Sequence, residues 1–170
     1  MIKKHRDSQK RIHFEDAVYF VSCKTENGHP YFKESIFCDL FVENLRICKK
    51  LKGFYLYGWV LLHNHFHLLI RPSDNFNISE VMRSLKTSIS CDINRIQSPE
   101  SAVPAPRFRE IYRNKFDITD YQKQFQKNHP TQIPYPKPCL PAGRFQWQKS
   151  YQDHYIRNDQ DFDYHMDNSF

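Results

Sequence analysis

The feature that most constrains this chain is the run from Leu62 to Ile70, LHNHFHLLI. Its three histidines, His63, His65 and His67, occupy alternate positions inside the most hydrophobic part of an otherwise polar sequence. On a β-strand, residues two apart point to the same face, whereas on a helix they diverge by about 200°. The aromatic and branched neighbours of the run favour a strand. The pattern therefore predicts that His65 and His67 project side by side and provide half of a site for a divalent metal ion.

The surrounding residues predict a mixed order of strands and helices. Hydrophobic runs and helical periodicity indicate strands at 17–23, 54–62 and 65–71, and helices at about 36–51 and 78–93. Asn77 and Glu80 match a capping box at the start of the second helix, and Asn158 is placed to cap a short C-terminal helix. This order is the opening of a ferredoxin-like βαββα(β) sandwich. We therefore expect an α+β fold with an antiparallel sheet that carries the histidines.

The stretch 97–143 interrupts this pattern and holds most of the ten prolines. It is basic, and the only helix-like piece within it lies near residues 118–126. We interpret the stretch as a proline-rich basic insertion or loop within one domain, residues 1–170, whose core spans about 14–96 and 144–170.

The formal net charge of +6 over 170 residues favours a polyanionic partner, and nucleic acid is the first candidate. A merely soluble basic protein is the alternative. Candidate DNA-contacting cations lie in the N-terminal arm, on the second helix and before the C-terminal helix: Lys3, Lys4, Arg6, Lys10, Arg11, Arg83, Lys86 and Arg157. The five cysteines form no CxxC pair, and neither a signal peptide nor a membrane-length apolar stretch is visible. These features predict a cytoplasmic protein with reduced thiols and no membrane partner.

Several of these segments together resemble one known family. Residues Gly58 to Ile70 are similar to the histidine-hydrophobe-histidine (HUH) motif of single-tyrosine transposases. The resemblance is to the REP-associated tyrosine transposase branch in particular, which is related to the IS200-like insertion-sequence transposases and usually has a proline at the position of His63. Residues 84–86, Trp147-Gln148 and the run from His154 to Asn158 support it. The resemblance implies a bacterial or archaeal DNA transposase of a mobile element, associated with the nucleoid when bound to DNA.

The family's chemistry suits the histidine pair. In this family two histidines and a third polar side chain hold Mg²⁺ or Mn²⁺ on the scissile phosphate of single-stranded or hairpin DNA. The resemblance assigns the two histidine positions to His65 and His67. A tyrosine then attacks the phosphate to give a 5′-phosphotyrosine link and a free 3′-hydroxyl. Because one phosphoester bond is exchanged for another, rejoining needs no ATP.

The family's nucleophilic tyrosine lies about ten residues after the Ile-Arg-Asn run, at a position that Asn168 holds here. Its third metal ligand is expected four residues further on. Tyr164, one helical turn before Asn168, is the candidate substitute nucleophile, and Tyr151 and Tyr155 are weaker candidates. The ending Asn168-Ser169-Phe170 is typical of a truncated or frame-shifted reading frame. We therefore expect either a truncated, inactive transposase or one that uses Tyr164.

Other functions remain open on the residues alone. The spacing of His63, His65 and His67 also matches the histidine-triad nucleotide hydrolases, in which His65 would attack a nucleotide phosphate without a metal ion. Asn64 departs from that pattern because it occupies a normally apolar position. A non-catalytic ferredoxin-like module could bind nucleic acid through aromatic and basic side chains. The histidines could also simply have hydrogen-bond partners at a turn and a strand edge. A monomer and a homodimer are equally compatible with the sequence.

Overall fold

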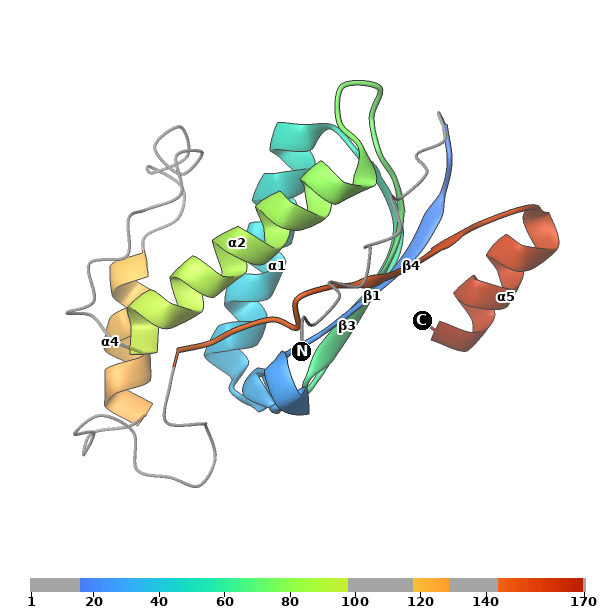
Figure 1. Cartoon of the computed structure of the whole chain (residues 1–170). Helices are drawn as coiled ribbons and strands as arrows, with labels where there is room; N and C mark the ends of the chain where they lie inside the picture. The colour runs from blue at the N-terminus through green and yellow to red at the C-terminus, as the bar shows by residue number, and fades with distance from the viewer. Residues whose placement is uncertain (1–15, 98–117, 129–143, 170) are drawn as a thin grey trace, which may run out of the picture.

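Four antiparallel strands form one sheet in the order β2-β3-β1-β4 within the residues that the computed structural model describes, 16–97, 118–128 and 144–169. The strands are β1 (Tyr19–Lys24), β2 (Tyr55–Leu62), β3 (His65–Arg71) and β4 (Gln152–Tyr155). The helices are α1 (Ser35–Lys52), α2 (Ile78–Gln97), α4 (Ile118–Asn128) and α5 (Asp159–Ser169), with short 3-10 helices at Glu26–Gly28 and Tyr31–Lys33. The strand order and the two crossover helices confirm the predicted ferredoxin-like α+β fold (Figure 1).

The two faces of the sheet meet different layers. Helices α1 and α2 cover one face, and α5 lies on the opposite side (Figure 1). On β3, Phe66 and Leu68 are fully buried, and Phe66 packs against Phe41 of α1. Because successive strand residues point to opposite faces, His65 and His67 project toward the side that carries α5. The prediction that His65 and His67 lie on one face of a strand is therefore confirmed.

The start of α2 and the end of α1 carry recognisable local signals in the sequence. The backbone N–H of Asn77 donates to Glu80 Oε2 at 2.9 Å, and the N–H of Glu80 donates to Asn77 Oδ1 at 3.0 Å, which completes the capping box of α2. Helix α1 ends at Gly53, whose φ of +65° is a left-handed conformation that glycine adopts without strain. These local signals mark where α2 begins and where α1 ends.

The C-terminal segment returns to the sheet along α2. Asn94 donates to the carbonyl oxygen of Phe145 at 3.1 Å and accepts from its N–H at 2.7 Å, so one buried side chain satisfies both backbone groups. Trp147 Nε1 donates to the Lys86 carbonyl at 3.1 Å, and Lys86 Nζ donates to the Gln148 carbonyl at 2.9 Å. These contacts guide the chain into β4, which pairs with β1 at the edge of the sheet.

Helix α4 confirms the helix-like piece predicted near 118–126 and shows that this part of the insertion packs on the core. Phe125 is buried and stacks on Phe37 of α1, with ring centroids 5.6 Å apart. Gln122 Nε2 donates to the Arg95 carbonyl of α2 at 3.0 Å. The remainder of the insertion and the N-terminal arm lie outside the described residues, so the domain boundaries stay a prediction. None of the helices described here is long and apolar enough to cross a membrane.

Replacement of Asn94 by alanine should lower the free energy of unfolding by about 2–4 kcal/mol, because both backbone groups of Phe145 lose their buried partner. Chemical denaturation of the purified protein measures the change. Thr87→Ala is the matched control, since Thr87 is exposed on the same helix and alanine is the better helix former. A loss for Asn94→Ala no larger than that of the control would contradict this docking role.

Candidate functional site

The two predicted metal ligands lie next to one another on β3. The ring centroids of His65 and His67 are 5.0 Å apart with an angle of 82° between the ring planes. Burial lowers the pKa of both imidazoles, and the nearby Lys24 ammonium lowers it further. The His65 ring adds to the lowering of the pKa of His67. Both rings are therefore neutral at pH 7, the state in which an imidazole nitrogen binds a metal ion.

The turn between β2 and β3 determines which ring nitrogen of His65 carries the proton. Asn64 Nδ2 donates to the Gly28 carbonyl at 3.0 Å, which orients the amide so that its Oδ1 faces His65. Asn64 Oδ1 lies 2.7 Å from His65 Nδ1. Since this oxygen can only accept, His65 Nδ1 must carry the proton, and the lone pair of the neutral ring is on Nε2. Asn64 thus leaves Nε2 of His65 as the nitrogen that could bind a metal ion, a role for Asn64 that the sequence pattern did not reveal.

His67 offers a second available nitrogen. Among the residues that the structure describes, its buried Nδ1 has no hydrogen-bond partner. Its ring stacks on Phe20 of β1 with centroids 5.2 Å apart. An orphaned buried nitrogen beside a second neutral imidazole fits a divalent metal ion. Two nitrogens suit Mn²⁺ better than Mg²⁺, whose ligands are mostly oxygens.

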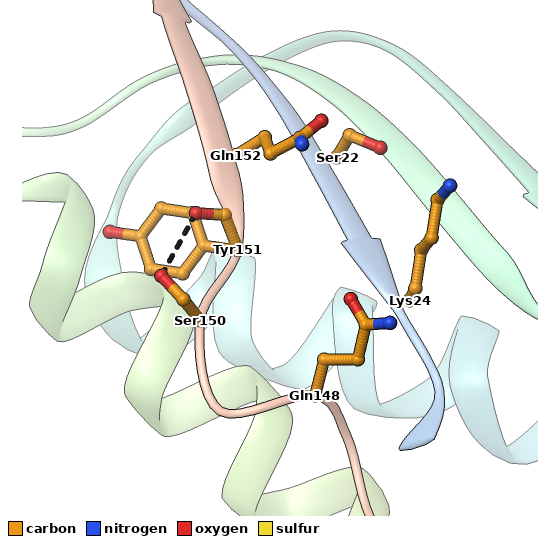
Figure 2. A pocket seen from close by; sticks show the side chains of 6 residues that line it. All are labelled: Ser22, Lys24, Gln148, Ser150, Tyr151 and Gln152. Carbon is orange, nitrogen blue, oxygen red and sulfur yellow. Dashed lines mark hydrogen bonds between the residues drawn. The ribbon is translucent and has the colours of Figure 1, made fainter. Parts of the chain in front are cut away.

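A polar surface pocket of about 300 Å³ lies between β1 and the segment that leads into β4 (Figure 2). Two of its lining residues are register partners of the histidines on β3: Ser22 lies opposite His67, and Lys24 opposite His65. The other lining residues are Gln148, Ser150, Tyr151 and Gln152. Lys24 is exposed and supplies a cation beside the imidazoles. The sequence-based prediction missed it, although Ser22 and Lys24 alternate on a strand as the histidines do.

Helix α5 lies over the same face of the sheet. Phe162 contacts Tyr57 of β2 edge-on at 5.4 Å, and His165 stacks on Phe20 of β1 at 4.2 Å between ring centroids. Phe20 therefore touches both His67 and a residue of α5. The C-terminal helix and the histidine pair form one continuous surface.

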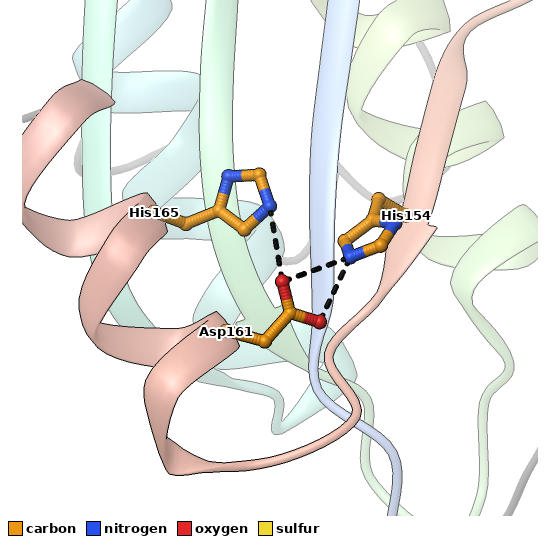
Figure 3. A group of neighbouring side chains, drawn as sticks. All are labelled: His154, Asp161 and His165. Atoms are coloured by element: carbon orange, nitrogen blue, oxygen red, sulfur yellow. Dashed lines mark hydrogen bonds and ion pairs between the residues drawn. The ribbon is translucent and has the colours of Figure 1, made fainter.

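A second cluster of ligand-type side chains joins α5 to β4 (Figure 3). His154 Nε2 lies 2.9 and 3.1 Å from the two carboxylate oxygens of Asp161, and His165 Nε2 lies 3.7 Å from Asp161 Oδ1. The N–H of Arg157 donates to Asp161 Oδ2, and this bond, followed by that of His154, lowers the pKa of the carboxyl group. The sequence prediction used His154 only as part of a motif and did not consider Asp161 or His165.

The candidate nucleophile lies on α5. Tyr164 is 62% exposed, and its ring meets His165 edge-on at 5.4 Å. Asn168, at the position where the family's tyrosine was expected, donates through Nδ2 to the Tyr164 carbonyl at 2.7 Å. The helix places Tyr164 beside the cluster and Asn168 one turn later.

The predicted DNA-contacting cations fall in different places. Arg83 and Lys86 lie on α2, which covers the face opposite the histidine pair, and Lys86 already binds the Gln148 carbonyl. Arg157 is exposed between β4 and α5. The five cations of the N-terminal arm lie outside the described residues: Lys3, Lys4, Arg6, Lys10 and Arg11. Their contact with DNA stays a prediction.

The similarity to known proteins is of two kinds. Residues 19–108 match the family described as "Transposase IS200 like". Among solved structures, the chain is similar to a REP-associated tyrosine transposase bound to a REP hairpin, with 16% identity and a TM-score of 0.56 over 96% of this chain and 70% of that chain. It is also similar to a candidate transposase from Deinococcus radiodurans R1, with 14% identity and a TM-score of 0.48 over 99% of this chain and 98% of that chain. No curated protein matches the chain.

Long-range ¹H–¹⁵N NMR spectra should show the neutral ring of His65 protonated on Nδ1, because Asn64 Oδ1 accepts that hydrogen. Asn64→Ala should remove this preference. Asn75→Ala, at an exposed asparagine before α2, serves as the control and should leave the His65 signals unchanged. A wild-type ring protonated mainly on Nε2 would be incompatible with the role assigned to Asn64.

Proposed function

Because the chain belongs to the IS200-like transposase family, we propose that it binds single-stranded or hairpin DNA and cleaves and rejoins it through a 5′-phosphotyrosine intermediate with a divalent metal ion. The observation that carries this proposal is the neutral, side-by-side pair His65 and His67 on a sheet face that also holds Lys24, a polar pocket and α5. Metal ligands, a phosphate-binding cation and a tyrosine-bearing helix are the parts that this reaction needs.

His65 and His67 hold the metal ion, Mg²⁺ or Mn²⁺, in this proposal. When bound, the ion polarises a phosphoryl oxygen and stabilises the negative charge that develops there. Lys24, opposite His65, contributes a second positive charge at the phosphate. The pocket beside Ser22 and Gln152 receives the adjoining nucleotide through polar contacts. The third metal ligand is not assigned.

Tyr164 is the proposed nucleophile. Its phenolate oxygen forms a bond to phosphorus while the bond from phosphorus to the 3′-oxygen breaks, which leaves a free 3′-hydroxyl after protonation. Attack of another 3′-hydroxyl on the same phosphorus reverses the step and releases the tyrosine. The exposed ring of Tyr164 on α5, the helix that lies over the histidine face, supports this assignment.

DNA is the proposed partner on two grounds. The net charge of +6 favours a polyanion. The solved transposase with the same fold is bound to a REP hairpin, which supports hairpin DNA as the substrate here. The proposal places the protein on the nucleoid when DNA is bound, and it holds for either a monomer or a homodimer.

A binding module without cleavage is the second candidate function. Asn168 stands at the position expected for the nucleophile, and an amide cannot provide the attacking oxygen. The histidine-triad hydrolase is less favoured, because His63 is exposed in the turn and only His65 and His67 belong to β3. Formation of a covalent DNA adduct separates transposase from binding module.

Replacing His65 or His67 with alanine should weaken Mn²⁺ binding at least about tenfold and prevent adduct formation, because each variant removes an imidazole ligand. Isothermal titration calorimetry measures the binding, and hairpin DNA affinity in the presence of EDTA should change little. His63→Ala is the matched control, since His63 is exposed in the turn before β3. An equal loss of Mn²⁺ binding for His63→Ala would contradict the assignment of the metal site to His65 and His67 alone.

Wild-type protein mixed with labelled hairpin single-stranded DNA and Mn²⁺ should form a covalent adduct on denaturing gels, and Tyr164→Phe should abolish it by removing the attacking oxygen. Tyr155→Phe is the control, because Tyr155 is also exposed but packs against Tyr19 on β1. Binding of the hairpin without any adduct would support the module without cleavage. An adduct that survives in Tyr164→Phe would refute the assignment of the nucleophile.

A further inference from the structure

We propose that His154, Asp161 and His165 form a second metal site, specific for a divalent transition metal ion such as Zn²⁺ and separate from the His65–His67 pair. The site takes one ligand from β4 and two from α5. Its role is to fasten the C-terminal helix to the sheet. The proposal does not depend on the catalytic activity proposed above.

The geometry of the three side chains supports a shared ion. One ligand atom from each residue lies within 4.8 Å of the other two (Figure 3). Tetrahedral Zn²⁺ with bonds of about 2.1 Å brings its ligand atoms to about 3.4 Å from one another. The two ligand atoms that lie furthest apart therefore need to approach by at most about 1.4 Å, a change that side-chain rotation supplies. Asp161 and His165 are four residues apart on α5 and so share one face of the helix.

Hydrogen bonds account for only part of the cluster around Asp161. The carboxylate accepts a hydrogen bond from the Arg157 N–H and lies within hydrogen-bond distance of His154 Nε2, a nitrogen that gives up its proton when it binds a metal ion. His165 Nε2 lies 3.7 Å from Oδ1, which is too long for a hydrogen bond. His165 is nonetheless held in place by its stacking on Phe20 at 4.2 Å. A nitrogen held near a carboxylate, just beyond hydrogen-bond distance, is placed to bind an ion between them.

The donor set decides the kind of metal. Two imidazoles and one carboxylate are the ligands of many zinc sites and of other transition-metal sites, whereas Mg²⁺ and Ca²⁺ take mostly oxygen ligands. The Arg157 N–H bond to Asp161 Oδ2 orients the carboxylate, as partners of metal ligands commonly do. Zn²⁺ is therefore the appropriate probe, with Co²⁺ as its spectroscopic substitute.

The site would stabilise the least anchored helix of the described chain. No residue of α5 is buried, and ring contacts such as those of Phe162 and His165 hold it against the sheet. An ion bound to His154 and to α5 stabilises the docked position by a free energy that rises with the logarithm of the ion concentration divided by its Kd. Since Tyr164 is adjacent to His165, a docked α5 also fixes the position of the candidate nucleophile relative to the histidine pair.

The test uses the full chain with His65→Ala and His67→Ala, so that the other pair cannot bind metal. Zn²⁺ titration by calorimetry should show one tight site per chain, Co²⁺ should give visible absorption bands of low coordination number, and Zn²⁺ should raise the melting temperature. Adding His165→Phe, which keeps the ring on Phe20 but removes the nitrogen, should weaken Zn²⁺ binding at least about tenfold. Asp161→Asn, which keeps an acceptor for Arg157, should have a similar effect.

Asp163→Asn provides the matched control, because Asp163 is exposed on the same helix and carries the same charge. It should leave Zn²⁺ affinity unchanged. The proposal is overturned if the His65→Ala, His67→Ala protein binds no Zn²⁺, or if its affinity is the same with and without His165→Phe and Asp161→Asn. Circular dichroism confirms that each variant is folded, so that an equal affinity in two folded variants is decisive. Failure here leaves the adduct test of the transposase unaffected.

Discussion

The antiparallel register between β1 and β3 is the constraint on which the rest of the structure depends. It sets Cys23 opposite Phe66 and Val21 opposite Leu68, all buried beneath α1 and α2. The same alternation sends His65 and His67 to the other face, where register partners Ser22 and Lys24 join them. A slip of one residue would bury the imidazoles and expose Phe66. The free energy of burying the core thus holds the candidate metal ligands in place.

The C-terminal segment adds polar side chains and a helix to the face that carries His65 and His67. Asn94 anchors Phe145 to α2, and β4 then pairs with β1 so that Gln152 and His154 lie beside Ser22 and Phe20. Helix α5 follows across the histidine face. Residues more than a hundred positions apart in the chain meet on this face. The hydrogen bonds of Asn94 with Phe145 and the pairing of β4 with β1 bring them together.

The histidine face combines neutral imidazoles with positive charge. Burial keeps the pKa of His65 and His67 low, while exposed Lys24 stays at the pocket rim. Neutral imidazoles can bind a cation without repelling it, and the lysine compensates for a phosphate. Phe20, in contact with both His67 and His165, links this pair to the cluster on α5. Movement of α5 would therefore change the positions of His165 and Phe20, and through Phe20 that of His67.

The sequence by itself determined the local elements and the histidine pair. Alternation from His65 to Ile70, the capping box at Asn77 and the cap at Asn158 are signals within one or two turns of chain, and each appears in the structure as predicted. The β-strand at 17–23 was shifted only slightly, to Tyr19–Lys24.

Only the tertiary structure decided which distant residues share a site. Lys24 joins the histidines through strand register, α2 places Arg83 and Lys86 on the other side of the sheet, and α5 brings Asp161 and His165 to His154. The periodicity of a sequence indicates which way a side chain points from its own helix or strand. Contacts between elements depend on how their buried faces pack together, and a short stretch of sequence does not contain that information.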